Sequence, residues 1–91
     1  MAYQIIVLPS AEADLKQMDA PVRRSVLRRL VWLHDNAGQI IHHRLANLPE
    51  DLAGLCRLRA GDYRILYWSY PNRSLLKVYR IQHRREVYEN L

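Results

Sequence analysis

Hydrophobic positions change their spacing along the chain, and the changes mark the expected elements. Residues 3–8 are an apolar run rich in β-branched side chains, which predicts a first strand. Ala11, Leu15 and Met18 then share one face of a short helix, and residues 21–36 carry an apolar stripe with helical spacing. We expect Ser10 to be the N-cap of the first helix, because its hydroxyl can accept a bond from a free backbone amide.

Beyond residue 51 the apolar spacing becomes that of strands. Residues 52–59, 63–70 and 75–82 alternate and are separated by short turn sequences. The connection before them lacks a clear period, and its three leucines should fix it to the core: Leu45, Leu48 and Leu52. The order β-α-α-β-β-β predicts an α+β fold, with an antiparallel sheet packed against an N-terminal helical hairpin and a short C-terminal helix or tail.

Length and composition indicate one globular domain, residues 1–91. Hydrophobic residues make up 49% and charged residues 25% of the chain, which is typical of a folded protein. Cys56 is alone, so an internal disulfide is excluded, and its place in a strand predicts a small buried thiol. The sequence lacks a recognisable signal peptide or membrane-spanning run, and we expect a cytoplasmic protein without a membrane partner.

Charge is distributed unevenly along the chain. Residues 57–85 contain eight basic residues and one acid, a net charge of +7, whereas the remainder has six basic and eight acidic residues, a net charge of −2. Twelve of the fourteen basic residues are arginine, whose planar guanidinium matches phosphate geometry. Basic side chains alternating with apolar ones along strands predict a surface that holds the phosphates of RNA or DNA.

The residue types near this surface favour RNA over DNA. His42 and His43 are neighbours in a connection and lack the spacing of a zinc site, and three glycines do not form a phosphate-binding loop. We therefore predict neither a metal nor another cofactor. Arginines can stabilise a phosphorane-like transition state without metal, and RNA supplies its own nucleophile, the 2′-hydroxyl. A basic site of this kind suits a ribonuclease better than a deoxyribonuclease.

Two motifs resemble a known family. The segment LAGLCRLRAGDYRILY at residues 52–67 resembles the L-x-x-L-R-x-G-x-Y-R-x-x-Y core of the RelE/ParE toxin superfamily. The segment HRREVY at residues 83–88 resembles the H-R-x-x-V-Y ending of its RelE branch. This resemblance implies a toxin of a type II toxin–antitoxin system, an endoribonuclease that cuts mRNA in the ribosomal A site by attack of the 2′-hydroxyl.

The resemblance also assigns catalysis to four residues, Arg57, Arg64, Arg84 and Tyr88. In that pattern Arg64 holds the scissile phosphate and Arg84 stabilises the transition state or protonates the leaving group. Tyr88 orients or deprotonates the nucleophile. One departure concerns residue 55, where the RelE pattern has a lysine and this chain has Leu55. The basic segment adds four expected RNA contacts, which are Arg59, Arg80, His83 and Arg85.

The implied partners are a cognate antitoxin, ribosomal RNA and mRNA. A toxin–antitoxin complex of this class is expected to be hetero-oligomeric and to bind operator DNA through the antitoxin. Two alternatives stay open: a ParE-like inhibitor of DNA gyrase, and a non-toxic relative that binds its antitoxin as a co-repressor. The roles of four arginines on the second helix also stay open between ribosome contact and solvation: Arg23, Arg24, Arg28 and Arg29.

Overall fold

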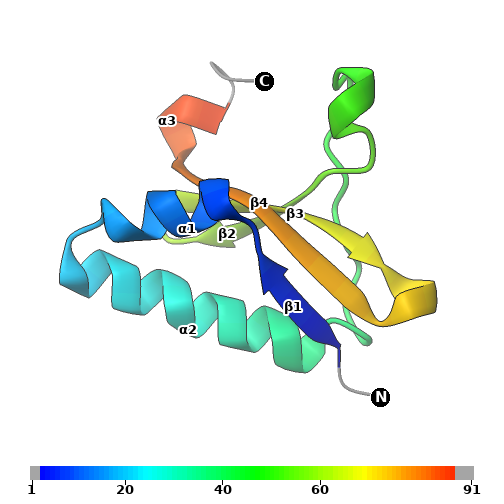
Figure 1. Ribbon diagram of the computed structural model, residues 1–91, viewed down its shortest axis with the longest axis horizontal. Coiled ribbons are helices and arrows are strands. Elements are labelled where there is room, and N and C mark those ends of the chain that lie inside the picture. Colours follow the sequence, from blue (N-terminus) through cyan, green and yellow to red (C-terminus); the bar gives the residue numbers. More distant parts are fainter. Residues whose placement is uncertain (1–2, 88–91) are drawn as a thin grey trace.

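The computed structural model describes residues 3–87, which form a four-stranded sheet with helices on both faces (Figure 1). The elements in chain order are β1 Gln4–Val7, α1 Pro9–Lys16, α2 Ala20–Asn36, β2 Cys56–Ala60, β3 Tyr63–Tyr70, β4 Leu75–His83 and α3 Arg84–Val87. Single 3-10 turns lie at Glu50–Leu52 and Pro71–Arg73. The predicted α+β class is confirmed. None of the described helices is long and apolar enough to cross a bilayer.

The strands lie in the order β1-β4-β3-β2. The predicted antiparallel meander β2-β3-β4 is confirmed, but β1 pairs with β4 in parallel, so the sheet is mixed and not wholly antiparallel. Two helices and a hairpin lie between these two strands in the chain. Such a long crossover can return the chain in either direction, so an apolar run alone does not reveal whether a strand pairs in parallel.

Helices α1 and α2 cover one face of the sheet (Figure 1). The predicted apolar stripe of α2 is confirmed, since Val26, Leu30 and Leu33 are buried in the main core. Ile65 and Tyr67 of β3 belong to the same core and are almost fully buried. Burial of this many large side chains on one face supplies the main driving force for the fold.

The start of α1 differs from the expected cap. The helix begins at Pro9, with Leu8 in the N-cap position, because β1 runs almost directly into a proline that favours the first helical position. The Ser10 hydroxyl instead donates a hydrogen bond of 2.6 Å to the carbonyl oxygen of Tyr79 in β4. Ser10 therefore attaches α1 to the sheet, and its expected capping role was wrong.

Asp14 completes the edge of β4 beyond the end of β1. Its Oδ2 accepts a hydrogen bond of 2.8 Å from the Ile81 amide. Both carboxylate oxygens also accept from the Arg80 guanidinium, at 2.8 and 3.0 Å. The Asp14 side chain is only 14% exposed, so these charge-assisted bonds are poorly screened by water.

The opposite face of the sheet has a smaller apolar cluster made by Leu55, Leu66 and Val87. Leu45 and Leu48 of the connection pack against it, and Leu52 is buried, as the sequence predicted for these leucines. Val87 places α3 over this face (Figure 1). The residue that departs from the RelE pattern, Leu55, is thus a packing residue between α3 and the sheet.

Replacing Asp14 with alanine should destabilise the fold by about 2–3 kcal/mol, because a buried amide and a guanidinium lose charged partners. Urea unfolding of the Asp14→Ala protein measures this loss. Glu12→Ala on the same helix is the matched control, since Glu12 forms only an exposed pair with Lys16 at 3.7 Å. The control should lose less than about 1 kcal/mol. Equal losses in the two variants would contradict this account of Asp14.

Introducing the lysine of the RelE pattern at Leu55 should cost about 3 kcal/mol or more, because the ammonium would be placed among buried apolar side chains. Leu55→Met, which nearly conserves volume, should cost less than about 1.5 kcal/mol. Thermal unfolding of both variants tests this expectation. An unchanged melting temperature in Leu55→Lys would show that residue 55 is not a packing position.

Candidate nucleic-acid interface

Arginines form a row across the sheet face that α1 and α2 leave open. Arg59 of β2 lies directly opposite Arg64 of β3, and Arg64 lies opposite Gln82 of β4. Residues opposite each other in antiparallel strands have side chains on the same face. Arg57 is two residues from Arg59 and so shares this face. The predicted placement of Arg57 and Arg64 on neighbouring strands is confirmed.

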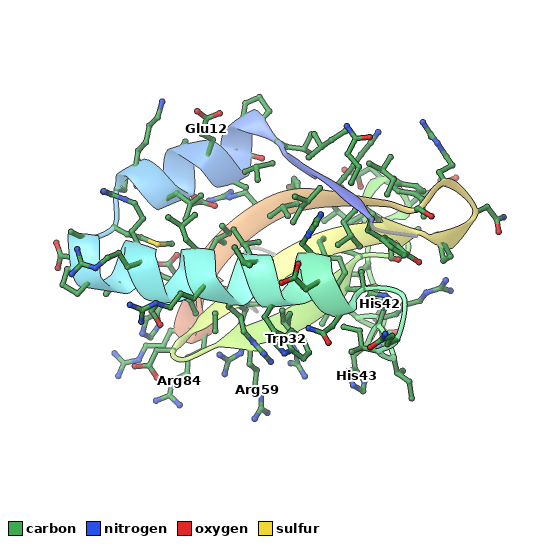
Figure 2. All side chains as sticks on the ribbon, turned by 90° about the horizontal axis from the view of Figure 1, so that it is seen from below. Glu12, Trp32, His42, His43, Arg59 and Arg84 are labelled. Carbon is green, nitrogen blue, oxygen red and sulfur yellow. The ribbon has the colours of Figure 1, made fainter. Side chains whose placement is uncertain are left out.

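The turn between β2 and β3 adds Arg84 to the row. The backbone amide of Arg84 donates to the Asp62 carbonyl oxygen at 2.7 Å, and its Nε lies 3.9 Å from the Asp62 carboxylate. Arg64 Nη1 donates to the carbonyl oxygens of Gly61 and Tyr63, both at 2.8 Å. The same turn therefore positions Arg64 and the start of α3. Figure 2 shows Arg59 and Arg84 along the same side of the molecule, away from Glu12.

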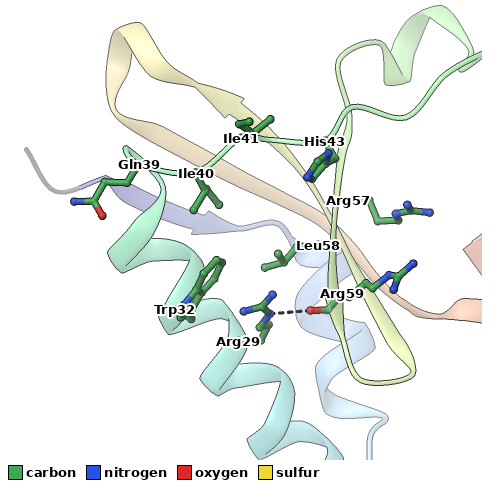
Figure 3. Close-up of a pocket in the computed structure, with 9 residues that line it drawn as sticks. All are labelled: Arg29, Trp32, Gln39, Ile40, Ile41, His43, Arg57, Leu58 and Arg59. Atoms are coloured by element: carbon green, nitrogen blue, oxygen red, sulfur yellow. Dashed lines mark hydrogen bonds between the residues drawn. The ribbon is translucent and has the colours of Figure 1, made fainter.

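A groove of about 670 Å³ runs beside this row, between α2 and the outer edge of β2 (Figure 3). Arg29 donates from Nε to the Arg59 carbonyl oxygen at 2.8 Å, and its guanidinium lies 4.1 Å from the centre of the Trp32 ring. His43 lines the same groove together with Arg57. Sequence reasoning left the role of Arg29 open and missed Trp32, although the i, i+3 spacing of these two residues off the apolar stripe of α2 was visible.

Two of the expected RNA contacts have other partners within the fold. Arg80 is held by Asp14 of α1 in the bidentate pair described above. His83 lies opposite Tyr63, whose ring packs against the main core. The Nδ1 atom of His83 accepts a hydrogen bond of 3.2 Å from the Arg85 amide. The Arg85 side chain is exposed at the start of α3. The expected catalytic Tyr88 lies outside the described residues.

Two weakly acidic side chains, Cys56 and Tyr67, are buried in the main core behind the row. Burial raises the pKa of the Cys56 thiol, which outweighs the opposite effect of the positive charge on Arg44. The expected buried thiol is confirmed. Burial likewise raises the pKa of the Tyr67 phenol, which lies 2.7 Å from His42 Nδ1. Both groups therefore belong to the main core and not to the open face.

Comparisons with known proteins agree with this architecture. Residues 5–88 match the family described as the ParE toxin of type II toxin–antitoxin systems. The RelBE2 toxin–antitoxin complex of Mycobacterium tuberculosis is similar, with a TM-score of 0.74 and 21% identity over 91% of this chain and 99% of that chain. The isolated RelE toxin of E. coli gives a TM-score of 0.68 and 22% identity over 98% and 94% of the two chains. A search of curated protein sequences found no match.

A third structure extends the likeness to archaea. The RelE–RelB complex of Pyrococcus horikoshii gives a TM-score of 0.69 and 20% identity over 92% of this chain and 97% of that chain. At identities near 20%, the structural likeness shows a shared fold. The family is shown by the sequence match, which covers nearly the whole chain. The resemblance to the RelE/ParE superfamily that the two motifs indicated is confirmed. The chain belongs to the ParE toxin family of type II toxin–antitoxin systems, within the RelE/ParE superfamily.

Proposed function

We propose that this toxin is a ribosome-dependent endoribonuclease that cleaves mRNA in the A site without a metal ion. The observation that carries the proposal is the row of Arg59 and Arg64 in register, with Arg57 beside it and Arg84 attached to the same turn. A phosphodiester lying on this row would meet several guanidinium groups fixed to neighbouring strands. Donors that are already in place cost no reorganisation when negative charge develops on the phosphate.

The proposed reaction needs two proton transfers and one displacement at phosphorus. The 2′-oxygen attacks the phosphorus, the bond to the 5′-oxygen breaks, the 2′-hydroxyl loses its proton and the 5′-oxygen gains one. Arg64 donates from Nη1 to the turn, which fixes its guanidinium in place, and the positive charge of that group would stabilise the phosphate. Tyr88 would remove or orient the 2′-proton. Arg84 would stabilise the charge as the 5′-oxygen leaves.

Two partners follow from this proposal. Ribosomal RNA would attract the basic segment over long range, since phosphates dominate such encounters. An antitoxin would cover the arginine row in the resting complex, as the antitoxin accompanies the toxin in the similar structures from Mycobacterium tuberculosis and Pyrococcus horikoshii. The resulting hetero-oligomer would bind operator DNA through the antitoxin. Ribosomes and mRNA place the activity in the cytoplasm.

A second candidate function is inhibition of DNA gyrase, which the family description favours because it names the ParE toxin. A protein that acts by binding gyrase has no need for arginines in cross-strand register that could hold a phosphodiester. The two functions are separated in expressing cells: the ribonuclease leaves cleaved mRNA with intact DNA, whereas the gyrase inhibitor leaves damaged DNA with intact mRNA. Neither lesion, with growth unaffected, would indicate the non-toxic co-repressor.

Arg64→Ala should reduce A-site cleavage by about 10²–10³-fold, because one preorganised donor to the transition state is lost. Primer extension on a reporter mRNA in a purified translation system measures the cleavage. Arg73→Ala is the matched control, since Arg73 is an exposed arginine in the turn between β3 and β4. It removes the same charge outside the arginine row, so it should change cleavage by far less than Arg64→Ala does.

Circular dichroism and thermal unfolding of both variants distinguish lost chemistry from a lost fold, because Arg64 also bonds to the β2–β3 turn. Equal cleavage by the Arg64→Ala and wild-type proteins would exclude Arg64 from the reaction. Intact message with the wild-type protein itself would reject the ribonuclease proposal and leave the gyrase inhibitor and the co-repressor as candidates.

A further inference from the structure

A second hollow of about 470 Å³ lies on the same face of the sheet as the arginine row, at the other end of β3. Residues on β3 alternate between faces, so Arg64, Leu66, Trp68 and Tyr70 share the open face. Leu66, which belongs to the smaller apolar cluster, lies between Arg64 and Trp68 along β3. The hollow is thus distinct from the groove beside β2, with which it has no lining residue in common.

Trp68 forms a rigid aromatic wall of this hollow. Its Nε1 donates to the Ala53 carbonyl oxygen at 3.1 Å, and its ring centroid lies 5.3 Å from that of Tyr79. Gly54 of the connection lies against the same ring and has a φ of 85°. Residues with a side chain adopt this conformation only with strain. Tyr70, two residues along β3, adds a second half-exposed ring. Both rings are in place before any ligand arrives.

Two cations and one acid also line the hollow. Lys77 lies opposite Trp68 in register, and its ammonium is 5.6 Å from the centre of the Tyr70 ring. Arg44 lies on the connection and is exposed. Neither cation forms a salt bridge within residues 3–87. Asp51 is the acidic side chain on this rim, and it opposes an anion there.

We propose that this hollow is a second subsite for single-stranded RNA, in which bases stack on Tyr70 and Trp68 while Lys77 and Arg44 hold phosphate. Fixed aromatic rings next to cations are the combination that binds unpaired bases with little sequence preference. A duplex keeps its bases stacked inside, so it cannot use the rings in this way. The subsite rests on the proposed function for its biological substrate, because it would hold RNA outside the bond that the arginine row contacts.

Binding is tested without ribosomes, so that it is independent of cleavage. The probe is a fluorescently labelled, 2′-O-methylated RNA of about ten nucleotides, which cannot be cut by 2′-hydroxyl attack. Tyr70→Leu should weaken binding about tenfold, since loss of one base–aromatic stack has this effect. Lys77→Gln should weaken binding and reduce the slope of log affinity against log salt by about 0.7, the value for one phosphate of a single strand. Fluorescence anisotropy at several salt concentrations measures both.

Lys16→Gln is the matched control, because Lys16 is the only lysine of the chain besides Lys77 and its side chain is exposed on α1. Asp51→Asn should strengthen binding a few-fold, since it removes the repulsive charge on the rim. The proposal is overturned if Tyr70→Leu and Lys77→Gln bind as tightly as Lys16→Gln, with all three variants folded by circular dichroism. It is also overturned if duplex RNA binds as well as the single strand and Tyr70→Leu does not alter that binding.

The two proposals fail separately. Binding that depends on Tyr70 and Lys77, together with an absence of ribosome-dependent cleavage by the wild-type protein, would support the subsite and reject the ribonuclease. Cleavage with binding that is indifferent to both substitutions would support the ribonuclease and reject the subsite.

Discussion

The arrangement of the whole sheet depends on which groups bond to the backbone amides and carbonyls along the two edges of β4. β3 pairs along its full length, whereas β1 pairs only with residues 75–78. Beyond that point the side chains of Ser10 and Asp14 reach from α1 to the backbone of Tyr79 and Ile81. A buried amide or carbonyl without a partner costs free energy, so α1 can lie only where these two side chains meet the strand. The position of α1 in turn sets where α2 crosses the sheet.

Much of this fold follows from periodicity, and the remainder depends on long-range pairing. The bounds of β3 and the apolar stripe of α2 agree with the sequence, because alternation and helical spacing are local properties. The parallel pairing of β1 and the role of Ser10 are set by residues more than sixty positions away in the chain. Local patterns contain no information about such partners.

The candidate site divides along the same line. Arg57, Arg59 and Arg64 were predictable as a group, since strand alternation and a short turn fix their common face. Arg80 and His83 have the same local sequence pattern, but Arg80 donates to the Asp14 carboxylate and His83 accepts from the Arg85 amide. On the helices, Arg23 donates to the Leu15 and Met18 carbonyl oxygens at the end of α1. The number of arginines alone therefore overstates the phosphate-binding surface, because Arg23 and Arg80 are bonded to α1 and the residues that follow it.

The buried thiol of Cys56 can be used to detect local opening of the structure around β2. It is the sole cysteine of the chain and is 1% exposed. The backbone of Arg44 pairs with Cys56, and the adjacent Arg57 amide donates to the His43 carbonyl oxygen, so the connection covers this stretch of the outer edge of β2. A thiol reagent can therefore reach the sulfur only when the connection, the sheet or the helices that cover the main core move away. The rate at which the thiol is alkylated, measured by mass spectrometry, therefore reports the rate of that opening. A ligand that covers β2 would slow the alkylation.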